Sequence, residues 1–293
     1  MIYQGKPCLP YFSSVVKNVT SPSIEIKKLV YIYLLHYAES DPDLALLSVN
    51  AIQKSLTDQN PQVRAMALRT MSGLRVPVIS QIVSLAIKRG VGDMSPHVRK
   101  AAALSIPKCY QLDPNTLPQL LEYLSTLLGD RQYFVVGPTV SAFLEVCPDR
   151  FDLVHKHYRG LVKKLVDMDE WGQLATIKLL LLYSRRCFPR RTEQVVQTSK
   201  KGFYEDDEQE VIETTDEIQV LDPDLEFFLK GCRSLLQSRS SAVIVAVVSC
   251  FLYLGTPDYL KDAVGPLIAL LRGPKDISQT ALYNIVSVAL VRS

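Results

Sequence analysis

The sequence lacks the motifs by which many enzymes are recognised. It contains no GxxxxGK followed by Ser or Thr and no GxGxxG, the glycine-rich loops that hold nucleotide phosphates on backbone N–H groups. Neither Ser13-Ser14 nor Ser240-Ser241 stands in the GxSxG context of a serine hydrolase. We therefore predict that the protein is not an enzyme, and we expect no catalytic residues, no cofactor and no small-molecule substrate.

Patterns of metal ligands are missing as well. The six cysteines form no CxxC pair and have no histidine at ligand spacing, so we expect buried free thiols in a reducing compartment. His155 and His157 flank Lys156, and side chains two positions apart on a helix point in different directions. His36 and His97 have no acidic residue or cysteine at ligand spacing. We expect no metal site.

The sequence also has no long apolar run and little net charge. Its longest apolar run, residues 242–254, is shorter than the roughly 20 residues that a bilayer-spanning helix needs. The N-terminus lacks the apolar core of a signal peptide. The net charge of +3 is too small to indicate nucleic acid as a partner. The expected location is cytosolic, or peripheral on a membrane.

A repeat is the main feature that the sequence does contain. Residues 58–68, DQNPQVRAMAL, return 35 positions later as DMSPHVRKAAA at 93–103. In both copies the Asp precedes a Pro by three positions and an Arg by six. Pro suits the first turn of a helix, where its missing N–H would have no partner. Self-similarity at this period indicates an array of helical repeats.

The apolar position that opens each helical pattern recurs along most of the chain. It falls at Ile26, Val63, Val98, Val135, Leu174, Val243 and Ile277, in steps of 37, 35, 37, 39, 69 and 34 residues. We predict an all-α fold, a HEAT- or armadillo-like α-solenoid of stacked two-helix repeats. The expected helices are 23–39, 43–56, 60–74, 77–89, 95–112, 114–128, 132–146, 150–166, 170–187, 223–237, 240–254, 258–272 and 275–291, after the second half of a helix at 10–20. In the first full helix, Ile24, Leu29, Ile32, Leu35 and His36 lie near one face.

The long step of 69 residues contains an acidic segment that divides the array. Residues 192–222 carry ten acidic side chains and two lysines, a charge of about −8, which leaves about +11 on the rest of the chain (+3 minus −8). Such a segment cannot bury enough apolar surface to offset the entropy of ordering, so we expect it to be disordered. We predict repeats at 1–191, incomplete at the N-terminus, the insertion at 192–222, and truncated repeats at 223–293. The insertion is interpreted as a solubilising loop, with a clamp over the arginines of 185–191 as the alternative.

Two sets of residues are expected to have structural roles. Arg64 and Arg99 could bind phosphate, but we interpret them with Asp58 and Asp93 as a repeat ladder, because the carboxylates offer each arginine a partner. An Asp and an Arg so spaced resemble the HEAT pattern, in which the pair bonds within and between repeats. The third copy has Val136 in place of the arginine, so the ladder is expected to end there. Trp171, the sole tryptophan, is predicted to be a core anchor beside Gly172, in preference to a ligand-stacking residue.

Basic clusters near predicted helix ends are the candidate binding residues. Several cations near an anionic leaflet could hold a protein there, since each contributes roughly 1 kcal/mol. The alternative for any single pair is a solvated face. The candidates for contact with an anionic membrane or a partner are Lys27, Lys28, Lys88, Arg89, Lys100, Arg185 and Arg186.

Several segments together resemble a beta-adaptin, the large beta subunit of heterotetrameric vesicle-coat adaptors. They are KKLVY at 27–31, DLALL at 43–47, NPQVR at 60–64, SPHVRK at 95–100 and EWGQ at 170–173. Three more resemble the beta subunit of the third adaptor complex: IEIKK at 24–28, EVCPDR at 145–150 and FYEDD at 203–207. The resemblance covers nearly the whole chain and weakens after Leu225.

The resemblance implies a scaffold in the traffic of Golgi and endosomal vesicles to lysosomes or vacuoles. Its partners would be the medium, small and second large subunits of the adaptor complex, an Arf-type GTPase and a peripheral anionic membrane. Family members have a longer trunk, a hinge and an ear, so this chain is expected to be a fragment, a truncated gene model or an isoform, without an implied clathrin site. Alone it is expected to be poorly soluble, since solenoid ends need polar caps. The alternative is a HEAT-repeat scaffold of another class, in nuclear transport or regulation.

Overall fold

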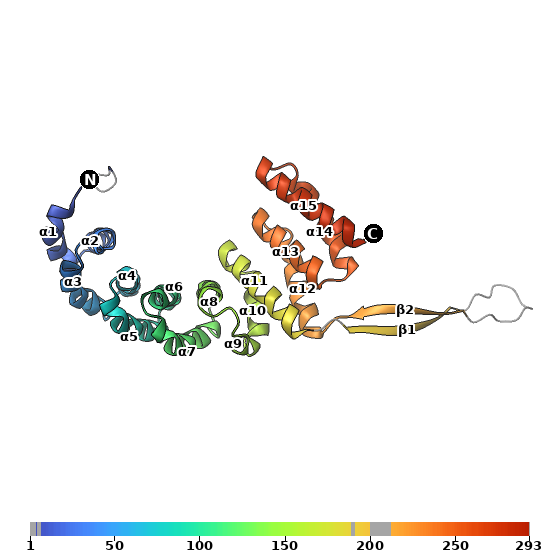
Figure 1. The fold of residues 1–293 in the computed structure, drawn as a ribbon, viewed down its shortest axis with the longest axis horizontal. Coiled ribbons are helices and arrows are strands. Elements are labelled where there is room, and N and C mark those ends of the chain that lie inside the picture. Colours follow the sequence, from blue (N-terminus) through green and yellow to red (C-terminus); the bar gives the residue numbers. More distant parts are fainter. Residues whose placement is uncertain (1–3, 5–6, 189–190, 200–211, 293) are drawn as a thin grey trace, which may run out of the picture. The chain divides into compact units, whose positions relative to one another are not determined.

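The computed structural model describes residues 4, 7–188, 191–199 and 212–292 and consists mainly of helices (Figure 1). Two compact units divide the chain at residues 1–176 and 177–293, so the long helix α11 (Glu170–Cys187) contributes to both. The predicted α-solenoid is confirmed in each unit, and most expected helix ends lie within three residues of the observed ones.

Unit 1 is a curved double row of helices. The even-numbered helices from α2 to α8 lie side by side on the inner side of the curve, and the odd-numbered α3, α5 and α7 lie on the outer side (Figure 1). Its elements are η2 (Leu9–Tyr11), α1 (Phe12–Val16), η3 (Lys17–Thr20), α2 (Ile24–Tyr37), α3 (Pro42–Ser55), α4 (Pro61–Gly73), η4 (Pro77–Ile79), α5 (Ser80–Val91), α6 (Pro96–Leu112), η5 (Pro114–Thr116), α7 (Leu117–Leu128), α8 (Tyr133–Val146), α9 (Asp152–His155), α10 (Tyr158–Lys164) and the start of α11.

Unit 2 continues the helix-on-helix packing. It contains the rest of α11 and then α12 (Pro223–Leu235), α13 (Ser241–Leu254), α14 (Pro257–Leu270) and α15 (Lys275–Arg292). Helix α13 is its central apolar element, and the side chains of Val247 and Phe251 are fully buried. Phe228 from α12 is buried with them. These contacts explain the apolar run at 242–254, which is a core helix.

Polar caps explain why several helices begin where the sequence predicts. Asn60 Oδ1 accepts the Gln62 N–H at 2.9 Å just before α4, and Asp222 Oδ1 accepts the Asp224 N–H at 2.9 Å before α12. Both helices then open on a proline. An acceptor at the cap and a proline in the first turn together satisfy N–H groups that have no partner within the helix.

One expectation about helices was wrong, and the structure decides the burial of another helix, which the sequence left open. The segment 150–166 forms two short helices, α9 and α10. His157, between them, packs against Gly129, where an added Cβ would lie 2.9 Å from the His157 Cε1. In α2 the stripe with Leu29 and Ile32 is exposed, and Tyr31 and its neighbours are buried instead. The tyrosine hydroxyl bonds to Ser55 Oγ at 3.2 Å, so this face satisfies its polar groups while packing on α3.

The acidic insertion also departs from its prediction. Strands β1 (Arg191–Ser199) and β2 (Ile212–Val220) pair antiparallel, with Arg191 opposite Val220 and Ser199 opposite Ile212. The expectation of disorder is therefore wrong for these segments, and residues 200–211 lie outside the described part of the chain. Val, Ile and Thr supply half of the residues in the two strands, and such β-branched residues favour extended pairing.

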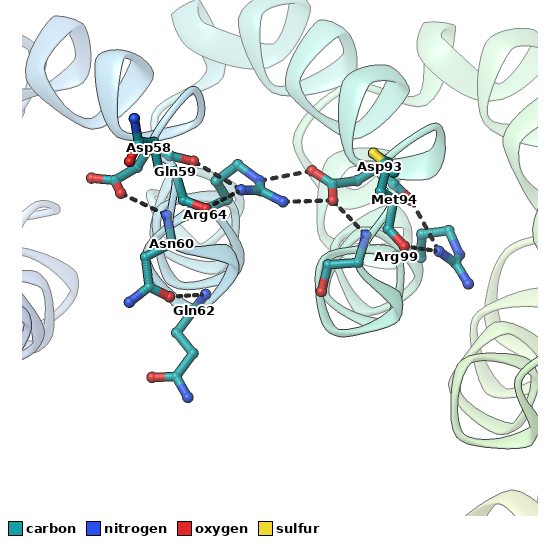
Figure 2. A network of polar contacts seen from close by, with 9 residues as sticks. Asp58, Gln59, Asn60, Gln62, Arg64, Asp93, Met94 and Arg99 are labelled. Carbon is teal, nitrogen blue, oxygen red and sulfur yellow. Dashed lines mark hydrogen bonds and ion pairs between the residues drawn. The ribbon is translucent and has the colours of Figure 1, made fainter.

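An ion-pair ladder joins three successive repeats of unit 1 (Figure 2). Arg64 donates from Nε and Nη2 to the two carboxylate oxygens of Asp93, both at 2.8 Å. Arg99 makes the same forked contact to Asp130, at 2.5 and 3.2 Å. The Nη1 of each arginine donates back to the turn before its own helix, to the carbonyl of Asp58 at 2.8 Å or of Asp93 at 2.9 Å. Each guanidinium therefore fastens its own turn to the next one.

The partners differ from those suggested by the spacing within one copy, because each arginine binds the carboxylate of the following repeat. At one end the Asp58 carboxylate lies 3.8 Å from Lys27 Nζ. At the other end, where Val136 replaces the arginine, Lys164 donates to the carbonyl oxygen of Asp130. The arginine ladder ends at Asp130, as expected, but a lysine from the next outer helix takes over the bond to the turn.

The ladder is shielded from solvent, and its hydrogen bonds and charges shift the pKa values of its members. Burial by itself would raise the pKa of the Asp93 and Asp130 carboxyls. Their hydrogen bonds from the arginines and from backbone N–H groups, together with the arginine charges, outweigh burial, so the pKa of both carboxyls is lowered. The bond to Asp93 raises the pKa of Arg64, and the bond to Asp130 raises that of Arg99. The exposed fraction of the four side chains is 18% or less.

Replacing Arg99 by Met should lower the free energy of unfolding by about 2–3 kcal/mol, because hydrogen bonds to a charged group are lost and Asp130 keeps a shielded, unpaired charge. Urea unfolding followed by helical circular dichroism measures the loss. The matched control is Arg150→Met, which removes a forked pair with Asp152 that is more than half exposed and should hardly move the midpoint. Equal losses in the two variants would contradict a specific role for the ladder.

The ladder should also make stability depend on pH. Because the folded-state pKa values of Asp93 and Asp130 lie below the unfolded value of about 3.9, their contribution is complete above that pH and is lost as the pH falls through the folded-state values. The urea midpoint should therefore fall as the pH is lowered below about 4. In the Asp93→Asn, Asp130→Asn variant it should start lower and fall less. If the urea midpoint depends on pH as steeply in the variant as in the wild type, Asp93 and Asp130 are not the source of the pH dependence.

Candidate functional site

The turn inside each repeat gathers basic side chains at one edge of unit 1. Outer helices end there, with Lys88 and Arg89 in the last turn of α5, where cations interact favourably with the helix dipole. Inner helices begin there, and Lys28 and Lys100 lie near the starts of α2 and α6. Lys28, Lys88 and Arg89 are exposed and Lys100 is half-buried. We call these four residues the basic edge.

Lys27 does not belong to the basic edge, although the sequence made it a candidate. Its residue exposure is 8%, and its ammonium group faces the Asp58 carboxylate. The helical turn that exposes Lys28 points Lys27 into the repeat. The expectation of a membrane or partner contact is therefore wrong for Lys27, which extends the ladder instead.

Arg185 and Arg186 belong to unit 2. They lie exposed in the last turn of α11, and the Arg185 guanidinium sits 5.1 Å from the centre of the Tyr253 ring. Arg190 lies outside the described residues, as does the side chain of Arg191. The cluster expected at 185–191 is therefore described at its first two members.

Trp171 is not the core anchor that the sequence suggested. The residue is 79% exposed, at the start of α11. Gly172 does permit close packing, since a Cβ added at Gly137 would lie 3.0 Å from the Gly172 Cα. The two glycines bring the backbones of α8 and α11 together, which leaves the neighbouring tryptophan outside the contact.

An aromatic position recurs at the starts of α6, α8 and α11 and was missed in the sequence. His97, Phe134 and Trp171 follow one another at intervals of 37 residues, each at the second position of its helix. The rings of His97 and Phe134 lie 5.5 Å apart between centroids. The equal spacing in the sequence was the signal that could have revealed this position. It indicates a surface position, because the apolar residue that enters the core comes one position later, as Val98 and Val135 do.

The remaining candidates form no catalytic arrangement in the described part of the chain. No group of three His, Cys, Asp or Glu residues there could hold a metal ion. Burial, followed by the charges of Lys156 and Lys164, lowers the pKa of His157. The cysteines are free and five of the six are buried, as expected, and burial raises the pKa of Cys147 to about 11. Among the described helices, none combines the length and the apolar character that crossing a bilayer requires.

Comparison with known proteins places this geometry in a family. The family model for the adaptin N-terminal region matches residues 1–292. The chain is 43% identical over 297 residues to AP-3 complex subunit beta-1 of Canis lupus familiaris, and 43% identical over 296 residues to the human subunit of that name. Each alignment covers 100% of this chain and 27% of the relative, so the chain spans about a quarter of their length.

A structural comparison agrees with the sequence comparison. A homology model of the full-length AP-3 complex in an intermediate open conformation contains a chain with 30% identity and a TM-score of 0.64. The match covers 97% of this chain and 47% of that one. Sequence identity, coverage and helical architecture lead to the same conclusion: this chain belongs to the adaptin N-terminal family.

Proposed function

We propose that this chain serves as a non-enzymatic scaffold, part of the trunk of the beta subunit of a heterotetrameric vesicle-coat adaptor. The observation that carries the proposal is the 43% identity to AP-3 beta subunits along the whole chain. The fold is suited to this role, because stacked repeats present long continuous surfaces to which several partners can bind. The process would be protein transport between Golgi or endosomes and the lysosome or vacuole.

The partners that follow from the proposal are the medium, small and second large subunits of the adaptor complex. Support comes from the similarity to a chain of a full-length AP-3 complex. A contact with an Arf-type GTPase belongs to the same proposal and rests on the family resemblance alone. The protein would be cytoplasmic and would bind peripherally to Golgi, endosomal and coated-vesicle membranes.

The basic edge is the proposed contact with an anionic membrane. Lys28, Lys88 and Arg89 are exposed and have no carboxylate partner within ion-pair distance in the described part of the chain. Cations close to an anionic leaflet contribute roughly 1 kcal/mol each. Arg64 and Arg99 are excluded from this role, because the ladder uses their donors. Arg185 and Arg186 are proposed as a second basic contact, on unit 2.

Assembly with a partner subunit tests the scaffold role. Co-expression of this chain with the medium subunit of an AP-3 complex should give a stable one-to-one species on affinity capture and gel filtration. The medium subunit of a different adaptor complex is the control and should be captured less. If the folded chain does not capture the medium subunit but a longer beta trunk does, the binding site for the medium subunit lies outside these repeats. Failure by both would contradict the family-based proposal.

Vesicle binding tests the basic edge. Neutralising Lys28, Lys88 and Arg89 to Gln should remove roughly 3 kcal/mol and weaken binding to phosphatidylserine vesicles by about 100-fold in a flotation titration. The matched control neutralises Lys261, Arg272 and Lys275, which are exposed on unit 2. Equal weakening by the two triple variants would show a response to net charge alone and would reject the basic edge as the membrane contact.

A further inference from the structure

Met94, in the turn between α5 and α6, is the most exposed of the large apolar side chains that the structure describes. The residue is 96% exposed, whereas the next most exposed reach 79%. Its backbone is nevertheless fixed by the ladder. Arg99 Nη1 donates to the Met94 carbonyl oxygen at 3.0 Å (Figure 2), and the N–H of Ser95 donates to Asp93 Oδ1 at 2.8 Å. The turn therefore holds in place an apolar side chain that has very little to pack against.

The repeat that presents this methionine is strongly basic. Residues 76–112 contain three lysines and two arginines but one carboxylate side chain, that of Asp93. Arg64 of the preceding repeat binds both oxygens of this carboxylate, each at 2.8 Å. The single negative charge of the repeat is therefore neutralised within the fold.

Three cations of the basic edge stand around this turn. Lys88 and Arg89 lie in the last turn of α5, and Lys100 lies near the start of α6. None of the three has a carboxylate within ion-pair distance among the described residues. In the two adjoining turns the ladder aspartates are paired with side chains of the fold as well. In the described part of the chain, the uncompensated charge around Met94 is therefore positive.

An apolar side chain among uncompensated cations fits the surface of an anionic bilayer. The lipid headgroups supply the negative charge, and the boundary between headgroups and acyl chains accepts an apolar side chain at a depth of about 5–10 Å. A protein partner would be expected to use several apolar anchors packed together, because binding energy at protein interfaces is concentrated in such clusters. A single methionine with few neighbours is better suited to a lipid surface, which can close around it.

We propose that Met94 inserts into the headgroup region of an anionic membrane while Lys88, Arg89 and Lys100 bind the headgroups around it. This inference rests on the proposed membrane contact of the basic edge and adds the residue that enters the bilayer. Attraction between the cations and the headgroups weakens as salt is added, whereas burial of an apolar side chain is not screened by salt. The methionine therefore supplies the part of the affinity that persists at high salt.

Flotation of the full chain with phosphatidylserine-containing vesicles measures what the side chain contributes. Met94→Ser should weaken binding by about 10-fold, because apolar burial is lost while the bond from Arg99 to the backbone carbonyl remains possible. The matched control is Val78→Ser, which removes a 79% exposed side chain of the same repeat, beyond the opposite end of α5. That helix is about 18 Å long, so the control should leave binding within about twofold. Equal weakening by the two variants would overturn the proposal.

Quenching by lipids with brominated acyl chains shows whether the side chain at this turn lies inside the bilayer. Trp171 is the only tryptophan of the chain, so the Met94→Trp, Trp171→Phe variant carries a single tryptophan, at the turn. Its fluorescence should fall steeply on brominated vesicles. The wild type is the control, because Trp171 is 79% exposed but follows the exposed carboxylates of Asp167, Asp169 and Glu170, which an anionic surface repels. The fluorescence of Trp171 should change little.

The outcomes separate this inference from the proposal on which it rests. If vesicle binding is sensitive to salt but unchanged in Met94→Ser, and the introduced tryptophan is not quenched, insertion is rejected and the basic edge remains a purely electrostatic contact. That result would favour a protein partner for the exposed methionine. If the folded wild type does not bind the vesicles, both proposals are rejected. Quenching of Trp171 as strong as that of the introduced tryptophan would also overturn the inference, because insertion would not be specific to the turn with Met94.

Discussion

The forked bond from an arginine of one repeat to the aspartate of the next sets the register in which the repeats of unit 1 stack. Arg64 and Arg99 each join a backbone carbonyl of their own turn to the carboxylate of the following turn, so one side chain fixes two repeats in register. The apolar core supplies more free energy than these contacts do, but burial is not directional. Bidentate charge-assisted hydrogen bonds are directional, and they set the position of each turn relative to its neighbour.

Alignment of the turns decides which side chains remain available for binding. Lys27 becomes part of the ladder and Lys28, one position later, becomes part of the basic edge. The same alignment places the C-terminal halves of the inner helices side by side, which forms a groove around Lys108. Unit 1 thus separates its polar residues into a bonded set that holds the repeats together and an exposed set that faces solvent.

The helices could be predicted from the sequence because their signals are local. A cap residue, a proline and an apolar position at a fixed offset mark α4 and α6, and their observed starts lie within one residue of the expected ones. The burial of α2 could not be predicted, since its two stripes are both apolar and the choice depends on whether Tyr31 finds a partner such as Ser55. At the break between α9 and α10, His157 packs against Gly129, 28 residues earlier in the sequence, and such a contact cannot be read from local signals.

The sequence alone determined the repeat period, the helical class, the family resemblance and the identity of the ladder residues, because each rests on the order of residues along the chain. Tertiary structure decided the partners and the exposure. Arg64 pairs with Asp93 because stacking brings successive turns within reach, and Trp171 is exposed because Gly137 and Gly172 bring the two helix backbones together beneath it. Partner choice and exposure depend on distances between repeats, and only the packed chain sets those distances.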